Sequence, residues 1–515
     1  MSTPNEPSES DATRPRGSAV RPRAAGRRVA GAPLSPGSAH PIVEVWSQAW
    51  PTVLTMTSFT VMQFSDKLMV GQVGYVELAA QGNGGIWAFT PIATIIGFLT
   101  VVNTFVSQNL GAGKPERGPA YAWNGLWLAI ACWLVFLLPF SFAIPMLFEW
   151  TVQFQKVDDP ARLVALQTQY AQILLWGAAI TLAGRAMHNY FFGLHRPRVI
   201  TISAIVGNLA NVLANYVLIF GEDGIPAYGL PGIPGVPALG LAGAAIGTLI
   251  GTAVEVSIPM AIFLGPAMNR ELKTRAAWRP DQSAIRDLLR VGWPAAMQYG
   301  NEIICWSIFM TTLVGYFGEQ HMSAGWIALQ YMHLSFMPAV GFSTAVNSIV
   351  GRYIGAGQPD IAHARARLGM TMALVYMTLC AVFFVAFRHS LIALFIGGDV
   401  EPAVREEIIA IGGRLLICAA VFQVFDAVGI VYTGALRGAG DTIVPGILTA
   451  VFSWVFIVGG GLAMIRWFSE LESVGPWIGA SAFIIVFGIT MAWRFERGRW
   501  RSIELVNKDG DAAAG

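Results

Sequence analysis

Long apolar stretches separated by short polar connections dominate the chain from about residue 45 to residue 495. Each is about as long as the 20 mainly apolar residues that a helix needs to cross a bilayer. Helices are expected because lipid satisfies no backbone hydrogen bonds, and the stretches are too long for barrel strands. The pattern predicts an all-α integral membrane protein with twelve transmembrane helices. The twelve stretches are 45–71, 84–110, 119–146, 164–190, 197–220, 239–263, 284–314, 326–354, 361–387, 405–436, 442–465 and 475–495.

A shift of 244 residues superposes one part of the sequence on another. Residues 97–115 align with residues 341–359, and ten of the nineteen positions are identical, where roughly one identity is expected by chance. The identities include Asn103 with Asn347 and a Gly-Ala-Gly sequence in each copy. Six spans in each half make both halves enter the membrane from the same side, as parallel repeats do. The duplication predicts two pseudo-symmetric six-helix bundles with a substrate path between them.

The repeats divide the chain into five segments. We expect a disordered cytoplasmic tail over 1–43, because it is rich in Pro, Ser, Gly and Arg and poor in aliphatic residues. The N-terminal bundle then covers 44–264 and the C-terminal bundle covers 284–496. A basic cytoplasmic linker, 265–283, joins them, and a cytoplasmic tail, 497–515, follows.

Composition and charge agree with this topology. The chain is 54% hydrophobic and 12% charged, whereas soluble domains carry about 25% charged residues. With both termini in the cytoplasm, 25 of the 33 basic residues fall on the cytoplasmic side, as the positive-inside rule requires. The net charge of +2 suggests no nucleic-acid partner, and the cysteines and histidines show no metal-ligand spacing. We therefore expect no cofactor and no catalytic residues.

Three carboxylates, Asp66, Glu302 and Asp426, fall inside predicted spans. Each costs about 2.5–3.5 kcal/mol to insert near a helix centre, and such residues normally face a bundle interior or a water-filled cavity. A transport role is the default interpretation, and the alternative is a protonated acid hydrogen-bonded between helices. Glu255 is a fourth such acid, for which a packing role and a functional role are equally favoured.

Other polar residues also lie in the spans. Asn211 and Asn215 are four residues apart and so share a helix face; they would coordinate a cation, orient Asp66, or form interhelical hydrogen bonds. Arg185 and Arg414 either pair with an acid or contact substrate, with pairing favoured. Asn103 and Asn347 are expected to be structural because both halves contain them. Lys67 is expected to extend toward the outer interface.

The two Gly-Ala-Gly loops and the sequence 434–442 (GALRGAGDT) resemble the multidrug and toxic-compound extrusion (MATE) family over about 45–495. The resemblance is greatest to its cation-coupled bacterial branch. There a seventh-span glutamate follows a proline by eight residues, as Glu302 follows Pro294, and a tenth-span aspartate precedes an arginine by eleven, as Asp426 precedes Arg437. The family's first-span aspartate and fifth-span asparagine pair match Asp66, Asn211 and Asn215. One departure is Lys67, where the family would have a small polar residue.

The resemblance implies a V-shaped monomer in the bacterial inner membrane that exports lipophilic, cationic drugs or toxins in exchange for Na⁺ or H⁺. Glu302 and Asp426 would form the main cation site, where Na⁺ is the one metal ion expected. Asp66, Asn211 and Asn215 would form a second site that responds to protons or drug. The alternatives are a lipid-linked oligosaccharide flippase of the same wider superfamily, or an exporter of one metabolite. A flippase should have a strongly basic central cavity, whereas this sequence offers acids with only Arg185 and Arg414.

Overall fold

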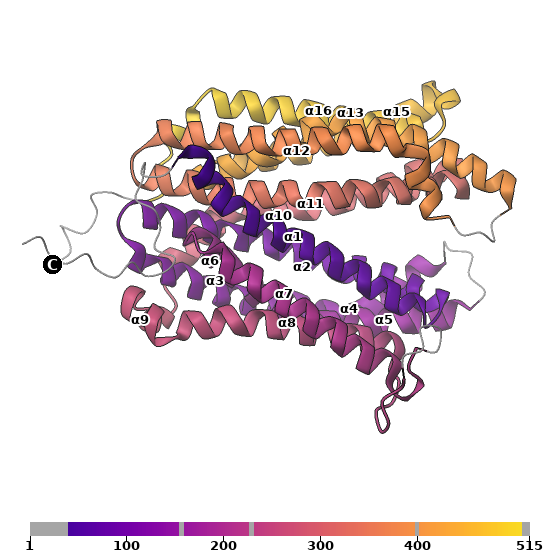
Figure 1. Cartoon of the computed structure of the whole chain (residues 1–515), viewed down its shortest axis with the longest axis horizontal. Coiled ribbons are helices and arrows are strands. Elements are labelled where there is room, and N and C mark those ends of the chain that lie inside the picture. Colours follow the sequence, from indigo (N-terminus) through magenta and orange to yellow (C-terminus); the bar gives the residue numbers. More distant parts are fainter. Residues whose placement is uncertain (1–39, 154–158, 226–230, 397–400, 507–515) are drawn as a thin grey trace, which may run out of the picture.

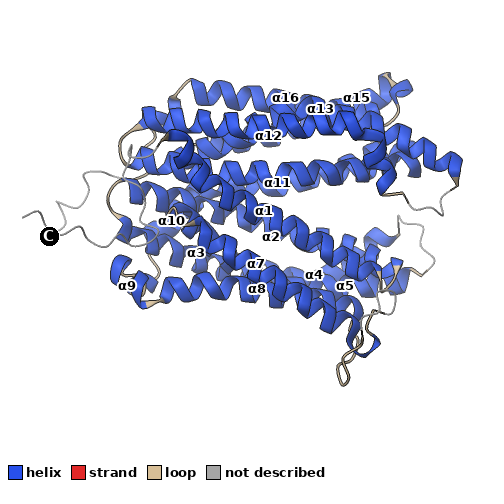
Figure 2. Cartoon of the chain, in the orientation of Figure 1, coloured by secondary structure: helices blue, strands red, loops and turns tan. Residues whose placement is uncertain are grey.

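The computed structural model describes residues 40–153, 159–225, 231–396 and 401–506, and nearly all of them are helical (Figure 2). The greater part of the tail predicted over 1–43 and the end of the tail predicted over 497–515 lie outside the described residues. The organisation of the remainder therefore follows from how its helices pack.

The first half contains six helical spans. They are α1 (Pro41–Gly71); α2 (Tyr75–Gly111); α3 (Gly118–Cys132) with α4 (Leu138–Val152); α5 (Pro160–Trp176) with α6 (Ala178–Gly193); α7 (Pro197–Asn215); and α8 (Gly240–Leu264). A short helix, α9 (Pro266–Leu272), lies in the predicted linker.

The second half repeats this order. Its spans are α10 (Gln282–Ile308); α11 (Glu319–Gly355); α12 (Pro359–Leu394); α13 (Pro402–Ala439); α14 (Ile443–Phe452) with α15 (Gly460–Trp467); and α16 (Val474–Glu496). Figure 1 shows α12, α13 and α16 on one side of the molecule and α3 to α8 on the other, with α1, α2, α10 and α11 between them.

Two of the twelve spans are less apolar than the other ten. In the described parts of the chain, nine helical stretches are long and apolar enough to cross a membrane, and the bent pair α5–α6, with its 47° bend, makes a tenth. The remaining two, α1 and α10, are 31 and 27 residues long but more polar. These helices carry Asp66 and Glu302 and lie centrally in Figure 1. The predicted all-α, twelve-span fold is confirmed.

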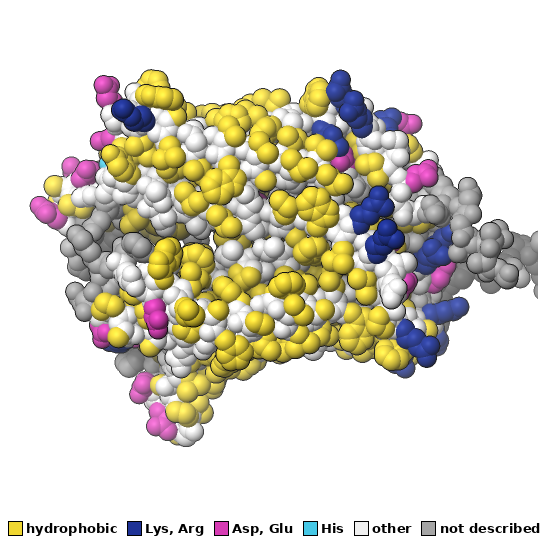
Figure 3. Space-filling view, turned by 180° about the vertical axis from the view of Figure 1, so that it is seen from behind, with side chains coloured by type: hydrophobic (Ala, Val, Ile, Leu, Met, Phe, Trp, Pro, Cys, Tyr) yellow, Lys and Arg dark blue, Asp and Glu magenta, His cyan; other side chains and the backbone are white. Residues whose placement is uncertain are grey.

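The surface has the pattern expected of a protein surrounded by lipid. Figure 3 shows hydrophobic side chains across the middle of one face, with most of the Lys and Arg side chains visible there near one end. Large apolar side chains such as Phe142 and Leu379 are 68% and 65% exposed. In water such a belt would be an aggregation site, so it is best explained by contact with acyl chains.

The repeated sequences found on the two halves meet each other in the fold. The hydroxyl of Ser348 donates to Oδ1 of Asn103 over 2.9 Å, and the hydroxyl of Thr104 lies 3.4 Å from Oδ1 of Asn347. Glycine is needed where α2 and α11 end, because a methyl group on Gly111 or Gly355 would overlap the backbone of the other helix. Asn103 and Asn347 thus have the structural role predicted, joining the halves.

Helix α1 belongs to both halves. Near its start, Val45 and Ala49 are buried in the same core as Tyr353 and Phe342 of the second half. Toward its end it packs against α7, in the first half. Any relative motion of the halves must therefore bend α1 or release one of its ends.

Candidate functional site

The first cluster of interest surrounds the carboxylate of Asp66, which is 7% exposed near the end of α1. The amide Nδ2 of Asn215 donates a hydrogen bond to Oδ1 of Asp66 over 2.6 Å, and the Thr248 hydroxyl donates to Oδ2 over 3.4 Å. The amide of Asn211 is directed at the same carboxylate but makes no hydrogen bond of good geometry with any described group. The structure brings the three predicted residues together and adds Thr248 from α8.

A close approach of α7 and α8 places these side chains. A methyl group on Gly247 would overlap the Asn215 amide oxygen, and one on Gly251 would come within 2.5 Å of the Asn211 Cβ atom. Small residues four apart on a helix allow such backbone contact in a membrane. The glycine spacing on α8, together with the adjoining Thr248, is the sequence signal that could have identified this helix as part of the site.

Two further buried polar groups border the first cluster. Tyr170 on α5 and Gln81 on α2 are each 6% exposed. Tyr170 lies within electrostatic range of Asp66 and contacts Gln81. Neither residue was predicted to belong to a site, because a single polar side chain in an apolar span does not reveal which neighbour it faces.

The second cluster consists of Glu302 on α10 and Asp426 on α13. Their carboxyl groups are close enough to interact electrostatically, and neither accepts a hydrogen bond from a described residue. Both side chains are only partly exposed. Two like charges in low dielectric repel strongly, and unpaired charges there are costly. The energy of this pair therefore depends on the positive charge or the protons near it.

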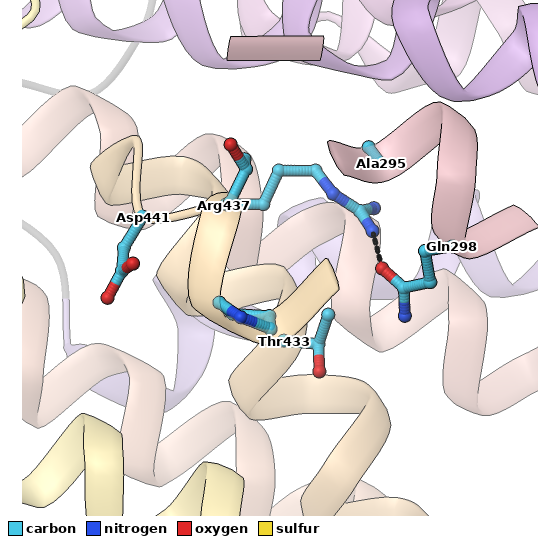
Figure 4. Close-up of a pocket in the computed structure, with 7 residues that line it drawn as sticks. Ala295, Gln298, Thr433, Arg437 and Asp441 are labelled. Carbon is cyan, nitrogen blue, oxygen red and sulfur yellow. Dashed lines mark hydrogen bonds between the residues drawn. The ribbon is translucent and has the colours of Figure 1, made fainter. Parts of the chain in front are cut away.

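Arg437 lies beside this pair, on the Glu302 side. Its guanidinium is 3.5 Å from Oε1 of Gln298, the contact drawn in Figure 4, and 5.8 Å from the ring centroid of Tyr299. Arg437 follows the span predicted over 405–436, but it lies inside the observed helix, half-buried in the last turn of α13. The helix continues through the motif and ends only at Gly440, where φ is +92°.

Asp441, which follows that turn, is not a free ligand. Arg494 donates two hydrogen bonds of 2.8 Å to its carboxylate. Figure 4 places Asp441 on the far side of Arg437 from Gln298, at the edge of the same narrow pocket. The bidentate pair neutralises this acid and fixes the end of α13 to α16.

A third buried cluster joins α6 and α8. Nε2 of His188 lies 3.4 Å from Oε1 of Glu255, and these side chains are 4% and 7% exposed. Arg185 lies within electrostatic range of Glu255 and 4.6 Å above the ring of Phe59. Of the two roles considered for Arg185, the structure favours pairing with an acid.

The remaining polar candidates have structural positions. Arg414 pairs with Glu472 over 3.2 Å, and both side chains are about half exposed. Lys67 is exposed. Asn208 donates to the backbone oxygen of Ser58 over 2.9 Å. None of the three lies in the clusters described above.

One buried ion pair between the halves was missed by the sequence analysis. Glu44, near the start of α1, accepts hydrogen bonds from the Tyr353 hydroxyl at 2.6 Å and from Nε of Arg365 at 2.8 Å. Glu44 and Arg365 are only 10% and 11% exposed. Glu44 is the first residue of the predicted N-terminal bundle (44–264) but lies one residue before the first predicted span, and only acids inside spans were considered as site candidates.

Comparison with known proteins gives consistent results. The sequence model of the MatE family matches residues 51–217 and 301–460. The probable multidrug resistance protein NorM of Burkholderia pseudomallei is 29% identical over 476 residues, which is 91% of this chain and 95% of that protein. The multidrug resistance protein NorM of Burkholderia vietnamiensis is also 29% identical, covering 91% and 96%.

Solved structures show the same fold. An outward-facing multidrug resistance MATE transporter superposes with a TM-score of 0.78 at 20% identity, covering 90% of this chain and 98% of that one. A crystal structure of MATE in complex with MaL6 gives a TM-score of 0.77 at 20% identity, covering 89% and 96%. At this identity the likeness concerns the fold alone.

Proposed function

This chain belongs to the MatE family, and from that membership and the acids within its helical spans we propose that it is a secondary antiporter, exporting lipophilic cationic compounds in exchange for Na⁺ or H⁺. The observation that carries the proposal is the juxtaposition of Glu302 and Asp426 without hydrogen-bond donors. Arg437 supplies one positive charge beside Glu302, but two carboxylates need more than one, so the pair would favour binding of a further small positive charge. An exchanger requires this because its empty site must not change sides freely.

The energy source is sufficient for this exchange. Moving one elementary charge across the membrane potential is worth about 2.3 kcal/mol per 100 mV. Because the exported compound is itself cationic, exchange of one ion for one compound moves no net charge and relies on the concentration gradient of the ion. Two ions entering against one monovalent cation move one net charge, which sustains a roughly 50-fold gradient of exported compound at 100 mV. No redox or bond-breaking chemistry is needed.

Alternating access would use the contacts between the halves. The hydrogen bonds of Glu44 with Tyr353 and Arg365, and the close contact of α2 with α11, would hold one side closed. Cation binding at the Glu302–Asp426 pair would change the relative energy of the two states, because a ligand shifts an equilibrium only through differential affinity. The basic distribution favours placing both termini in the cytoplasm of a bacterial inner membrane.

A lipid-linked oligosaccharide flippase is less well supported. Both arginines that could serve it have acidic neighbours: Arg185 lies near Glu255, and Arg414 pairs with Glu472. An exporter of one specific metabolite would use the same ion cycle, and a transport screen over several compounds would distinguish it.

Ethidium transport in inverted membrane vesicles, with Na⁺ and pH gradients imposed separately, tests the proposal. We expect one or both gradients to drive ethidium accumulation in the wild type. Glu302→Gln and Asp426→Asn should each reduce that transport by at least about tenfold, since hydrogen bonds and contacts to charged groups contribute about 1.5–3 kcal/mol.

Glu149→Gln is the matched control, because Glu149 is an exposed acid on α4 and should leave transport unchanged. Equal amounts of each variant in the membrane must be verified by immunoblotting. Gradient-driven transport that survives both substitutions would refute the assignment of the pair.

A further inference from the structure

The buried pair of His188 and Glu255 has no explanation in the proposed exchange cycle. Both ring nitrogens of His188 and the Oε1 atom of Glu255 lack a hydrogen-bond partner among the described residues. A buried polar atom without a partner costs about 1–3 kcal/mol. Three such atoms side by side are unusual, since buried polar groups are nearly always paired.

One proton between Nε2 of His188 and Oε1 of Glu255 would satisfy these two facing atoms, two of the three without a partner. The Nε2–Oε1 separation of 3.4 Å is about 0.5 Å longer than a charge-assisted hydrogen bond between nitrogen and oxygen. With one proton shared between the His188 ring and the Glu255 carboxylate, a small shift of the two side chains would form that bond. Without it, a donor is missing whenever the ring presents its unprotonated nitrogen to Glu255.

The charge of Arg185 opposes proton binding at this pair, so a proton that is bound there can also leave. Arg185, on the same helix as His188, lies within electrostatic range of Glu255 and compensates its carboxylate. Tyr299 of α10 is the further titratable group that faces Arg185. Among the described residues, no other charged group on α1, α2 or α7 acts on His188 or Glu255. The cluster thus alternates between net charges of about zero and +1.

The pair is also connected mechanically to the Asp66 cluster. Glu255 and Thr248 are seven residues apart on α8, hence on one face of the helix. The Cβ of Glu255 packs against Gly207 of α7, one turn before the backbone that positions Asn211. A shift of α8 that closes the His188–Glu255 contact must therefore move the helix that holds Thr248 against Asp66.

We propose that His188 and Glu255 together bind one proton and form a second coupling site in the first half, acting on the Asp66 cluster through α7 and α8. The coupling role of this pair rests on the proposed antiport. Proton binding by the pair does not depend on it. The two can therefore be tested separately.

Proton binding is tested on the purified full chain in detergent, without substrate. Proton uptake between about pH 8 and pH 5, the range in which histidine ordinarily titrates, is measured with a pH electrode in weak buffer. We expect Glu255→Gln and His188→Gln each to take up about one proton fewer than the wild type, and Glu149→Gln to match the wild type. The double variant should lose no more than either single one, because the pair shares one proton.

Infrared difference spectra give an independent readout, since Glu255→Asp should retain a pH-dependent change in carboxyl absorption that Glu255→Gln lacks. Proton counts equal to wild type in both single variants would overturn the proposal. If the counts differ but wild-type vesicles transport no ethidium, the proton site stands and the antiport fails. If Glu255→Gln does not fold, the site is tested by His188→Gln and by Glu255→Asp, which keeps a carboxylate.

Discussion

The two halves share a fold and differ in how they treat their buried carboxylates. In the first half, Asp66 receives hydrogen bonds from Asn215 and Thr248, so amide and hydroxyl donors stabilise its charge. In the second half, Glu302 and Asp426 lie near each other and receive none from the described residues. Under the proposed exchange, the first arrangement should tolerate an empty site, whereas the second should need more positive charge than Arg437 alone supplies. We therefore expect the two halves to have sites with different ligand requirements.

The largest expected effect tests this difference directly. The double variant Glu302→Gln with Asp426→Asn removes both charges and should abolish any Na⁺-dependent rise in melting temperature of the purified protein. Asp66→Asn should retain that rise, because the carboxylate pair is intact, while reducing transport. A ligand at 100 times its Kd stabilises a fold by about 2.7 kcal/mol, which thermal melts resolve easily. Loss of the Na⁺ response in Asp66→Asn alone would reverse the assignment of the two halves.

The second effect concerns α1, which joins the halves. Glu44→Gln leaves Arg365 buried without its charged partner, a change that typically costs about 3–5 kcal/mol. We expect this loss to open the contact between α2 and α11, so that a cysteine introduced by Ser348→Cys reacts faster with a maleimide in a background without the four native cysteines. The Asp66 cluster of the first half should still respond to protons and to substrate.

Glu77→Gln is the control, because its partner Arg162 is 59% exposed and exposed pairs contribute only about 0–1 kcal/mol. An unchanged labelling rate in Glu44→Gln would show that this ion pair does not hold the halves together.

The third effect is confined to the first half. Gly247→Ala places a methyl group against the Asn215 amide and should push α8 from α7, at a cost of about 1–3 kcal/mol for overpacking. Transport should fall while the Na⁺ response of the second half persists. Gly82→Ala is the matched control, since a methyl group there meets nothing within 4 Å. Equal transport in both variants would contradict a tight α7–α8 contact as the support of the Asp66 site.

Much of this organisation could be predicted from the sequence, because apolar length, charge placement and internal repetition are properties of the chain itself. The repeated asparagines and Gly-Ala-Gly loops were correctly interpreted as architecture. What the sequence could not give was the partner of each polar side chain. Thr248 and His188 lie on helices whose rotation about their axes is set by packing. The glycines beside Thr248 indicate a close helix contact, but they do not show that Thr248 faces Asp66 or that His188 faces Glu255. The span predicted over 405–436 ends one residue before Arg437, whereas helix α13 continues through the glycine-containing motif to Ala439.

The smallest expected effect asks whether the two halves act independently. Tyr299 of α10 lies within electrostatic range of Arg185 in the first half and has Arg437 of the second half 5.8 Å from its ring. A cation–π contact contributes about 0.5–2 kcal/mol, so Tyr299→Leu should alter both sites slightly, whereas Tyr299→Phe keeps the ring and should alter neither by more than about twofold. The measurement is the Na⁺ concentration for half-maximal transport at several pH values. If the halves are coupled through this ring, the Na⁺ requirement depends on pH in the wild type and in Tyr299→Phe but less so in Tyr299→Leu. An identical pH dependence in all three proteins would mean that the two carboxylate sites communicate only through the movement of the helices.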